Sequence, residues 1–254
     1  MDKLQKLTIE REKIREMERN LTQLIKEERR LSVKEKRENN RRVVSFESYE
    51  RLRDENIQLR GLFSILKKAE KITYNNLGVI LMEQGRYREA IECFEEAIAN
   101  SGRMFEACVN LGYIYFKLGE LEKVVEVNEK AVEIEPRYAR GHANIGFAYL
   151  QMARPDEAIK ALERAIEINP EIAQAWSNLI NAYLQKDDIE KAVETGEKLV
   201  EFAPDFALGQ NNLAYAYYLK ENYEKAVKHL DKAMELGFQA HPEFVSRLAP
   251  YRVE

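Results

Sequence analysis

The sequence is poor in the residues that disulfide-stapled folds and all-β folds need. Its 254 residues include only two cysteines, so a disulfide framework is excluded. Glycine (11) and proline (6) are scarce and 33% of the residues are charged, which favours a helix-rich globular protein. No apolar run approaches the roughly 18 residues of a membrane-spanning helix. The opening residues, MDKLQKLTIEREK, lack the apolar core of a signal peptide. Together these absences predict a cytoplasmic protein.

The motifs of enzymes and metal sites are missing as well. We find no glycine-rich phosphate loop, no Cys or His pair at metal-ligand spacing and no Ser/His/Asp set. Cys93 and Cys108 lie in apolar helical contexts, which predicts buried structural thiols. Carboxylates such as Glu92, Glu95 and Glu96 are interpreted as exposed helix residues that contact only water. We therefore expect no catalytic residue, no metal and no cofactor.

The net charge of −4 conceals two regions of opposite sign. Residues 1–70 contain 19 Lys and Arg against 14 Asp and Glu, whereas residues 71–254 contain 21 against 30. Such an asymmetry predicts two regions with different roles. It also permits the basic region to bind an acidic partner or the acidic region of its own chain.

A period of 34 residues runs through residues 71–240. Leu or Ile precedes each anchor position of this period, and Tyr follows three residues later in four of the five units. Small residues, mostly Ala, recur 12 and 19 residues after each anchor. A repeat of this length indicates an array of helix-turn-helix units. The anchors are Gly78, Gly112, Gly146, Ile180 and Ala214.

Packing considerations support such an array. Small residues let the two helices of a unit approach closely while Leu and Tyr fill the space between them, and stacked units bury a continuous core. Pro136, Pro170 and Pro204 share one register and are expected to end the second helix of their units. Residues 241–254, with Pro242 and Pro250 around a short helix, are predicted to cap the array. The predicted units are residues 71–104, 105–138, 139–172, 173–206 and 207–240.

Over residues 71–240 this pattern resembles the tetratricopeptide repeat. The resemblance implies an all-α fold, a right-handed α-solenoid in which the first helix of each unit lines a concave face. It also implies a non-enzymatic role as a protein–protein interaction adaptor. The sequence departs from the family pattern in units one, two and four, which predicts looser packing at the second helices of units two and four. The departures are Gly102, Val124, Asn128, Gly196 and Leu199.

Every unit carries an asparagine two residues before its anchor. A carboxamide offers both a donor and an acceptor, so a row of them can hold a peptide backbone whatever its sequence. The resemblance implies the same role for these residues. The alternative is that the amides serve packing between repeats. This asparagine ladder consists of Asn76, Asn110, Asn144, Asn178 and Asn212.

The positions that the repeat geometry turns toward the concave face carry little charge. Only four of these 30 positions are charged, against 33% of the whole chain. Amides alternate there with aromatic residues, which favours a groove for an apolar or aromatic peptide or helix of a partner protein. Phe116, Leu150, Leu184 and Tyr218 are equally compatible with packing between repeats. The peptide-binding residues predicted in addition to the asparagine ladder are Tyr113, Phe147, Asn181, Tyr215 and Arg140.

The same positions argue against an acidic C-terminal tail as the partner. Related repeats that bind such tails carry Lys, Asn and further basic residues on three successive first helices. Only Asn110 and Arg140 match this set, whereas Asn75, Val79 and Asn144 occupy its other places.

Residues 1–45 are predicted to form a charged helix and a basic linker. Leucine, isoleucine and methionine recur at heptad spacing from Leu7 to Leu31. About three heptads allow either a lone helix or a weak coiled coil that makes homo-oligomers. The linker, from about Ser32 to Ser45, has no interleaved aromatic to stack on a base, which favours a tether over a nucleic-acid site.

Residues 46–70 are predicted to form an amphipathic helix that caps the first repeat. Leu52, Leu59, Leu62 and Leu66 form its apolar stripe. The N-terminal helices are also candidates to occupy the groove. Two alternatives to the adaptor therefore stay open, a self-assembling scaffold and an assembly or regulatory subunit of a larger enzyme complex.

Overall fold

The computed structural model describes residues 74–99 and 105–252, together with six isolated helical positions between residues 9 and 26. The predictions for residues 1–45 and 46–70 otherwise lie outside the described residues. Two compact units divide the chain, with their boundary between Asn110 and Leu111. Every regular element in the described ranges is a helix. Within those ranges, no helix has the length and apolar character needed to cross a membrane.

The first unit contains a helical hairpin. Residues 74–83 form its first helix, and α3 (Tyr87–Ala99) is its second. Tyr74 and Phe94 are almost fully buried between them. A Cβ atom on Gly78 would lie 2.7 Å from the ring of Phe94, so glycine is required where the two helices cross. Helix α4 (Phe105–Leu118) begins in this unit and continues past its boundary.

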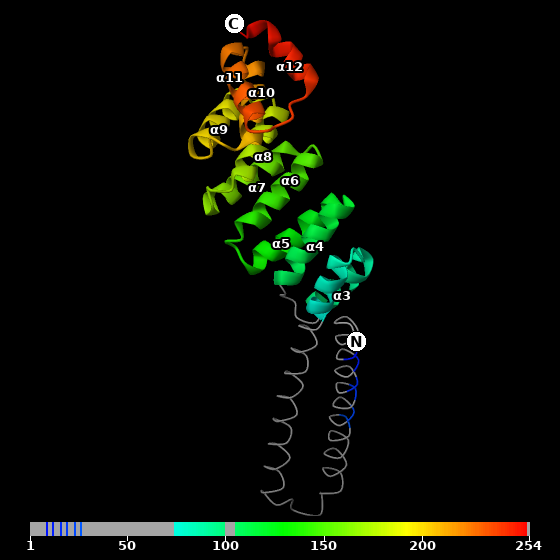
Figure 1. Cartoon of the computed structure of the whole chain (residues 1–254). Coiled ribbons are helices and arrows are strands. Elements are labelled where there is room, and N and C mark those ends of the chain that lie inside the picture. Colours follow the sequence, from blue (N-terminus) through cyan, green and yellow to red (C-terminus); the bar gives the residue numbers. More distant parts are fainter. Residues whose placement is uncertain are drawn as a thin grey trace, which may run out of the picture. The chain divides into compact units, whose positions relative to one another are not determined.

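The second unit is a stack of helix-turn-helix pairs closed by a short helix (Figure 1). This architecture confirms the predicted all-α solenoid. Helices α5, α7 and α9 each end two residues before Pro136, Pro170 or Pro204, as predicted. After α4, the helices are α5 (Leu121–Ile134), α6 (Ala139–Gln151), α7 (Pro155–Ile168), α8 (Ala173–Gln185), α9 (Ile189–Phe202), α10 (Ala207–Leu219), α11 (Tyr223–Glu235) and α12 (Pro242–Leu248), with a 3-10 turn at Ala249–Tyr251.

The core of the second unit lies between its first and second helices. The small residues of the repeat are in this core, where Ala158, Ala192 and Ala226 have no exposed surface. The structure does not have the looser packing that was predicted for the second helices of units two and four. Asn128 is only 1% exposed, and a Cβ atom on Gly196 would lie 2.7 Å from Leu213. A buried amide and a neighbouring leucine therefore fill the two places.

The turn between the two helices of each repeat contains one residue with left-handed backbone. The residue after it donates its amide N–H back to the carbonyl of the last helical turn, as Asp188 does to Tyr183 (2.9 Å). Gly85 and Gly119 take this conformation without steric cost, whereas three non-glycine residues take it at a cost. These five positions are 34 residues apart: Gly85 (φ 73°), Gly119 (74°), Ala153 (55°), Asp187 (61°) and Glu221 (59°).

The first helices of the second unit lie on the inner side of its curve. Helix α8 contacts both α6 and α10, whereas the second helices of the described array make no comparable contact with one another. Because the helices that pack closer together lie on the inside of a curved array, α6, α8 and α10 form the inner face, with the part of α4 from Leu111 onward in the same register. This face contains the predicted groove positions of the second unit.

On the outer seam, tyrosines join successive repeats through hydrogen bonds to carboxylates. The hydroxyl of Tyr183 donates to Glu163 Oε1 (2.9 Å), and that of Tyr217 donates to Glu197, also 20 residues earlier. Lys225 Nζ lies 4.8 Å from the centre of the Tyr217 ring. Glu163 and Glu197 therefore do more than contact water, which is all that the sequence analysis assigned to such carboxylates. The missed signal is an acidic residue at one register of all five repeats: Glu95, Glu129, Glu163, Glu197 and Asp231.

Candidate functional site

The asparagine ladder is not uniform. Asn76 and Asn110 belong to the first unit, where Asn76 is exposed and Asn110 is half-buried. Asn144 on α6 is exposed. Asn178 on α8 and Asn212 on α10 are buried, at 5% and 6% exposure. The five residues share a register but not an environment, so they cannot all contact a ligand in the same way.

Each ladder carboxamide in the second unit makes a hydrogen bond to another side chain of the array. Asn144 Nδ2 donates to Asn128 Oδ1 (3.2 Å), and Asn178 Oδ1 accepts from Gln174 Nε2 (3.1 Å). Asn212 Nδ2 donates to the hydroxyl of Ser177 (2.9 Å), which ties α10 to α8. The bonds of Asn144 and Asn212 join neighbouring repeats, as the packing alternative predicts, whereas the bond of Asn178 lies within α8. They leave Asn144 as the ladder residue of this unit with the most accessible amide.

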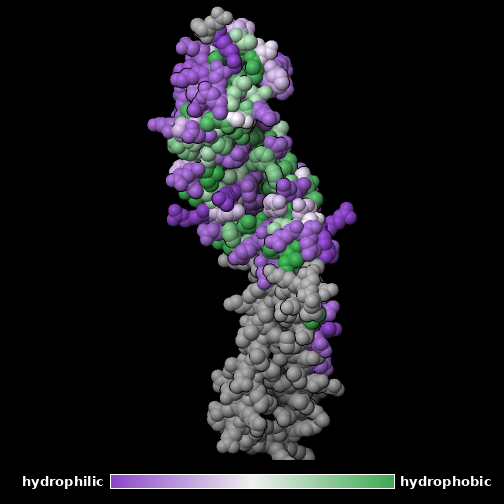
Figure 2. All heavy atoms as spheres, viewed as in Figure 1, coloured by the Kyte–Doolittle hydropathy of each residue, from purple (hydrophilic) through white to green (hydrophobic). Residues whose placement is uncertain are grey.

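Aromatic side chains reach solvent from the inner face. Tyr113, Phe116 and Tyr215 expose 49%, 46% and 43% of their surface. Phe147, one repeat after Tyr113, is half-buried, with its ring centre 5.5 Å from that of Phe116. Figure 2 shows hydrophobic residues at the surface of the array, between hydrophilic ones. Soluble proteins rarely expose large apolar side chains in groups, so a cluster of this kind indicates an interaction surface.

The remaining predicted positions complete the inner face. Asn181 occupies the register of Phe147 and Tyr215 in unit four and is half-buried, and Arg140 is exposed in the first turn of α6. Leu150 is buried at 4% exposure, while Tyr218 and Leu184 are partly buried against the core. These three residues therefore contribute to packing, whereas Phe116 is exposed.

The ion pairs of the described residues lie outside the first helices. Among the described residues, the ion pairs join turns, second helices and the tail, and none involves a residue within a first helix. Lys117 Nζ lies instead over the ring of Tyr113, 5.6 Å from its centre. A ligand on the first helices would thus meet rings and amides, whereas at the C-terminal end Glu243 and Arg247 of α12 form an ion pair.

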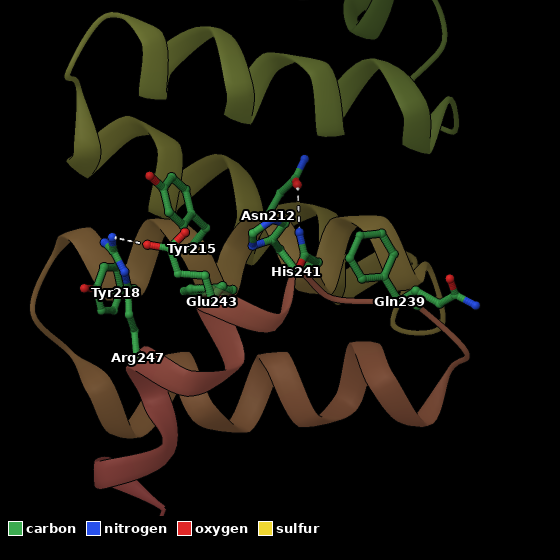
Figure 3. A pocket seen from close by; sticks show the side chains of 10 residues that line it. Asn212, Tyr215, Tyr218, Gln239, His241, Glu243 and Arg247 are labelled. Atoms are coloured by element: carbon green, nitrogen blue, oxygen red, sulfur yellow. Dashed lines mark hydrogen bonds and ion pairs between the residues drawn. The ribbon is translucent and has the colours of Figure 1, made fainter.

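A cavity of about 510 Å³ brings two of the predicted residues together at the C-terminal end of the inner face. Asn212 and Tyr215 of α10 line it, and α12 forms the opposite wall (Figure 3). Phe244 and Arg247 of α12 also line the cavity, although neither was among the predicted site residues. The signal was that the 34-residue period continues past residue 240, since Leu248 and Tyr251 stand at the registers of Ala214 and Tyr217.

Burial perturbs the titratable groups between the repeats. Burial, with the hydrogen bond to Glu163, raises the pKa of Tyr183 to about 12. Burial also lowers the pKa of His229, whose Nδ1 lies 2.7 Å from Gln210 Oε1 and whose ring stacks on Tyr217. These groups hold helices together, and Tyr183 and Glu163 also line an open cavity of about 410 Å³ on this side of the array. Among the described residues, no group of three His, Cys, Asp or Glu is placed to hold a metal ion.

Comparison with protein families identifies the repeat. Models of the tetratricopeptide repeat match residues 72–101, 145–207 and 207–237, and a further TPR repeat model matches residues 112–152. Together these matches cover most of the repeat array. No curated protein sequence matches the chain.

Several solved structures share this architecture. The chain is similar to MamA, with 27% sequence identity and a TM-score of 0.60, over 63% of this chain and 94% of MamA. It is also similar to YrrB, described as a TPR protein with an unusual peptide-binding site, with 22% identity and a TM-score of 0.60, over 71% of this chain and 92% of YrrB. PilF of Pseudomonas aeruginosa has 22% identity and a TM-score of 0.61, over 73% of this chain and 85% of PilF.

Proposed function

Because the chain belongs to the tetratricopeptide repeat family, whose members are typically non-enzymatic interaction modules, we propose that it is an adaptor that binds an apolar or aromatic peptide or helix of a partner protein on its inner face. The observation that carries the proposal is the exposure of Tyr113, Phe116 and Tyr215 on that face. Aromatic side chains of this kind supply most of the affinity in protein interfaces, because they bury a large area with few rotatable bonds.

The ladder contributes differently from repeat to repeat. Asn144 is exposed, so its amide is the best placed of the ladder residues in the second unit to pair with a bound backbone. Asn212 ties α10 to α8 through its hydrogen bond to Ser177, whereas Asn178 is bonded to Gln174 within α8. A hydrogen bond contributes about 0.5 to 1.5 kcal/mol, so this amide orients the peptide while the aromatic anchors supply most of the affinity.

A peptide selection tests the proposal. Random peptides of about twelve residues are selected on the full chain, and an enriched peptide is titrated by fluorescence anisotropy. Replacing Tyr113 and Phe116 together by Ala should weaken binding about tenfold or more. The matched control is Met234→Ala, which removes a 42% exposed apolar side chain from the second helix α11 and should leave the affinity unchanged.

Two further results decide the proposal. Urea unfolding of the double variant should match that of the natural chain, because both rings are about half exposed. If the selected peptide binds the double variant and the control equally well, the inner face is not its binding site. Self-assembly through residues 1–45 stays a prediction from sequence.

A further inference from the structure

Helix α12 stands where a sixth first helix would begin. Leu248, at the anchor register, has no exposed surface, and Tyr251, at the tyrosine register, stacks on Tyr223 with ring centres 3.9 Å apart. The helix has seven residues, against 13 in α10. It therefore covers part of the inner side of α10 and leaves the rest open, and the cavity lies at this edge.

Aromatic rings form the wall of the cavity on both sides. The ring of Phe244 meets Tyr215 and Tyr218 edge to face, with centres 5.5 and 5.6 Å away. Tyr215 keeps 43% of its surface exposed in spite of this contact. Phe238, in the loop before α12, also lines the cavity. An incoming ring can thus pack against Tyr215 in the offset or edge geometry that aromatic pairs prefer.

The acidic and basic side chains of the lining on α12 form one ion pair. Glu243 Oε1 accepts a 2.6 Å hydrogen bond from Arg247, so the two charges on α12 compensate each other (Figure 3). At the other end, Asn212 is anchored to Ser177, and Asn211 makes only a long 3.5 Å hydrogen bond to Asn212. The amide of Asn211 is therefore available to exchange this weak bond for a peptide group, which offers one donor and one acceptor.

We propose that this cavity binds one aromatic residue of an uncharged peptide segment, with the ring against Tyr215 and Phe244 and the adjoining peptide group at Asn211. This inference rests on the proposed function, because the residue belongs to the peptide held on the inner face. A volume of about 510 Å³ lies within the usual range of small-ligand pockets and holds a ring together with its backbone. A charged side chain would instead have to compete with the Glu243–Arg247 pair.

The cavity can be tested with a minimal probe. N-acetyl-L-tryptophanamide is titrated into the full isotope-labelled chain and followed by NMR, with N-acetylglycinamide as the control compound. We expect the amide signals of residues 211–218 and 238–247 to shift and to saturate with a Kd on the order of 1 mM. Equal shifts with both compounds, or no shift up to about 10 mM, would overturn the proposal.

Two variants locate the binding. Asn211→Phe places a ring in the cavity and should weaken binding of the probe at least tenfold. Lys160→Phe adds the same ring at an exposed position on α7 and should leave binding unchanged. Unfolding curves of both variants check the fold. If Asn211→Phe binds the probe as well as the natural chain does, the cavity is not the site.

This test can fail separately from the test of the proposed function. The affinity of a selected peptide could fall on replacing Tyr113 and Phe116 but stay unchanged in Asn211→Phe. That result would contradict the cavity proposal alone. Binding of the tryptophan probe without any selected peptide on the inner face would refute the adaptor groove instead.

Discussion

The carboxamide of Asn144 donates a 3.2 Å hydrogen bond to Asn128 Oδ1, and this bond links a residue of the ladder to the core. Asn128 is 1% exposed and donates in turn to the carbonyl of Val124 (2.8 Å). The repeats before and after it place Phe94 and Leu162 at the same register. The second repeat therefore has a buried polar residue where its neighbours have an apolar one, and this residue restrains the exposed amide of Asn144.

Replacing Asn128 by Leu should raise the free energy of unfolding by about 1 kcal/mol, because it removes a buried amide and adds apolar contact. Leu162 shows that leucine fits, since it packs on Gly146 at the equivalent place. Urea unfolding measures the change. The reverse substitution, Leu162→Asn, should cost about 2 kcal/mol or more. A loss of stability in Asn128→Leu would show that the amide pair holds α5 to α6.

The outer seam gives a second prediction. Tyr183→Phe removes the hydroxyl that donates to Glu163 and should lower the free energy of unfolding by about 1 kcal/mol. Tyr215→Phe is the matched control. This tyrosine is 43% exposed, so the loss of its hydroxyl should change the free energy of unfolding little. Thermal or urea unfolding of the two variants provides the comparison. Equal effects would mean that the hydrogen bond between α7 and α8 adds nothing to stability.

Acid should weaken the contact of α10 with α11 through His229. Burial, with the nearby Lys228 and Lys225, lowers the pKa of His229 below its ordinary 6.5, although Glu197 acts in the opposite direction. The unfolded chain then binds this proton more readily than the folded chain does. The contribution of His229 is therefore fully present above pH 6.5 and is lost as the pH falls through the lowered pKa.

Unfolding measured between neutral pH and about pH 5 tests this expectation. His229→Gln keeps a hydrogen-bonding side chain next to Gln210 and should flatten the dependence of stability on pH. His241→Gln, at an exposed position, is the control for the loss of an imidazole. The expectation is wrong if the natural chain and His229→Gln lose stability in parallel.

Substitutions at two equivalent left-handed turn positions should change stability in opposite directions. Ala153→Gly should raise stability by about 0.5 kcal/mol, because relief of the strain at φ 55° exceeds the entropy that glycine loses on folding. Gly119→Ala should lower stability by about 1 kcal/mol, and only through the backbone, since nothing lies within 4 Å of the added Cβ atom. Calorimetric melting of both variants gives the two shifts. Shifts of the same sign would contradict this explanation.

The periodic features of the fold could be predicted from the sequence. Helix pairs, their ends before Pro136, Pro170 and Pro204, and the buried small residues all follow from one period, because every repeat solves the same packing problem. The burial of individual ladder residues could not be predicted in this way. It depends on side chains that differ between repeats, such as Ser177 next to Asn212 and Asn128 opposite Asn144.

The C-terminal cavity was missed for a related reason. The tail was interpreted as a cap, but its position relative to α10 depends on contacts of Phe244 with Tyr215 and Tyr218. Those contacts require that α12 keep the register of a first helix while ending after seven residues. The 34-residue pattern of a complete repeat includes a second helix, and no second helix follows α12 among the described residues.

The seam bonds join residues that are only 20 positions apart, as in Tyr183 to Glu163 and Tyr217 to Glu197. Because these separations are short, each of these hydrogen bonds can form without a distant part of the chain. As the polypeptide leaves the ribosome, each new first helix finds its carboxylate partner on the second helix that emerged just before it. The array is therefore suited to fold one repeat at a time during synthesis, starting from its N-terminal end.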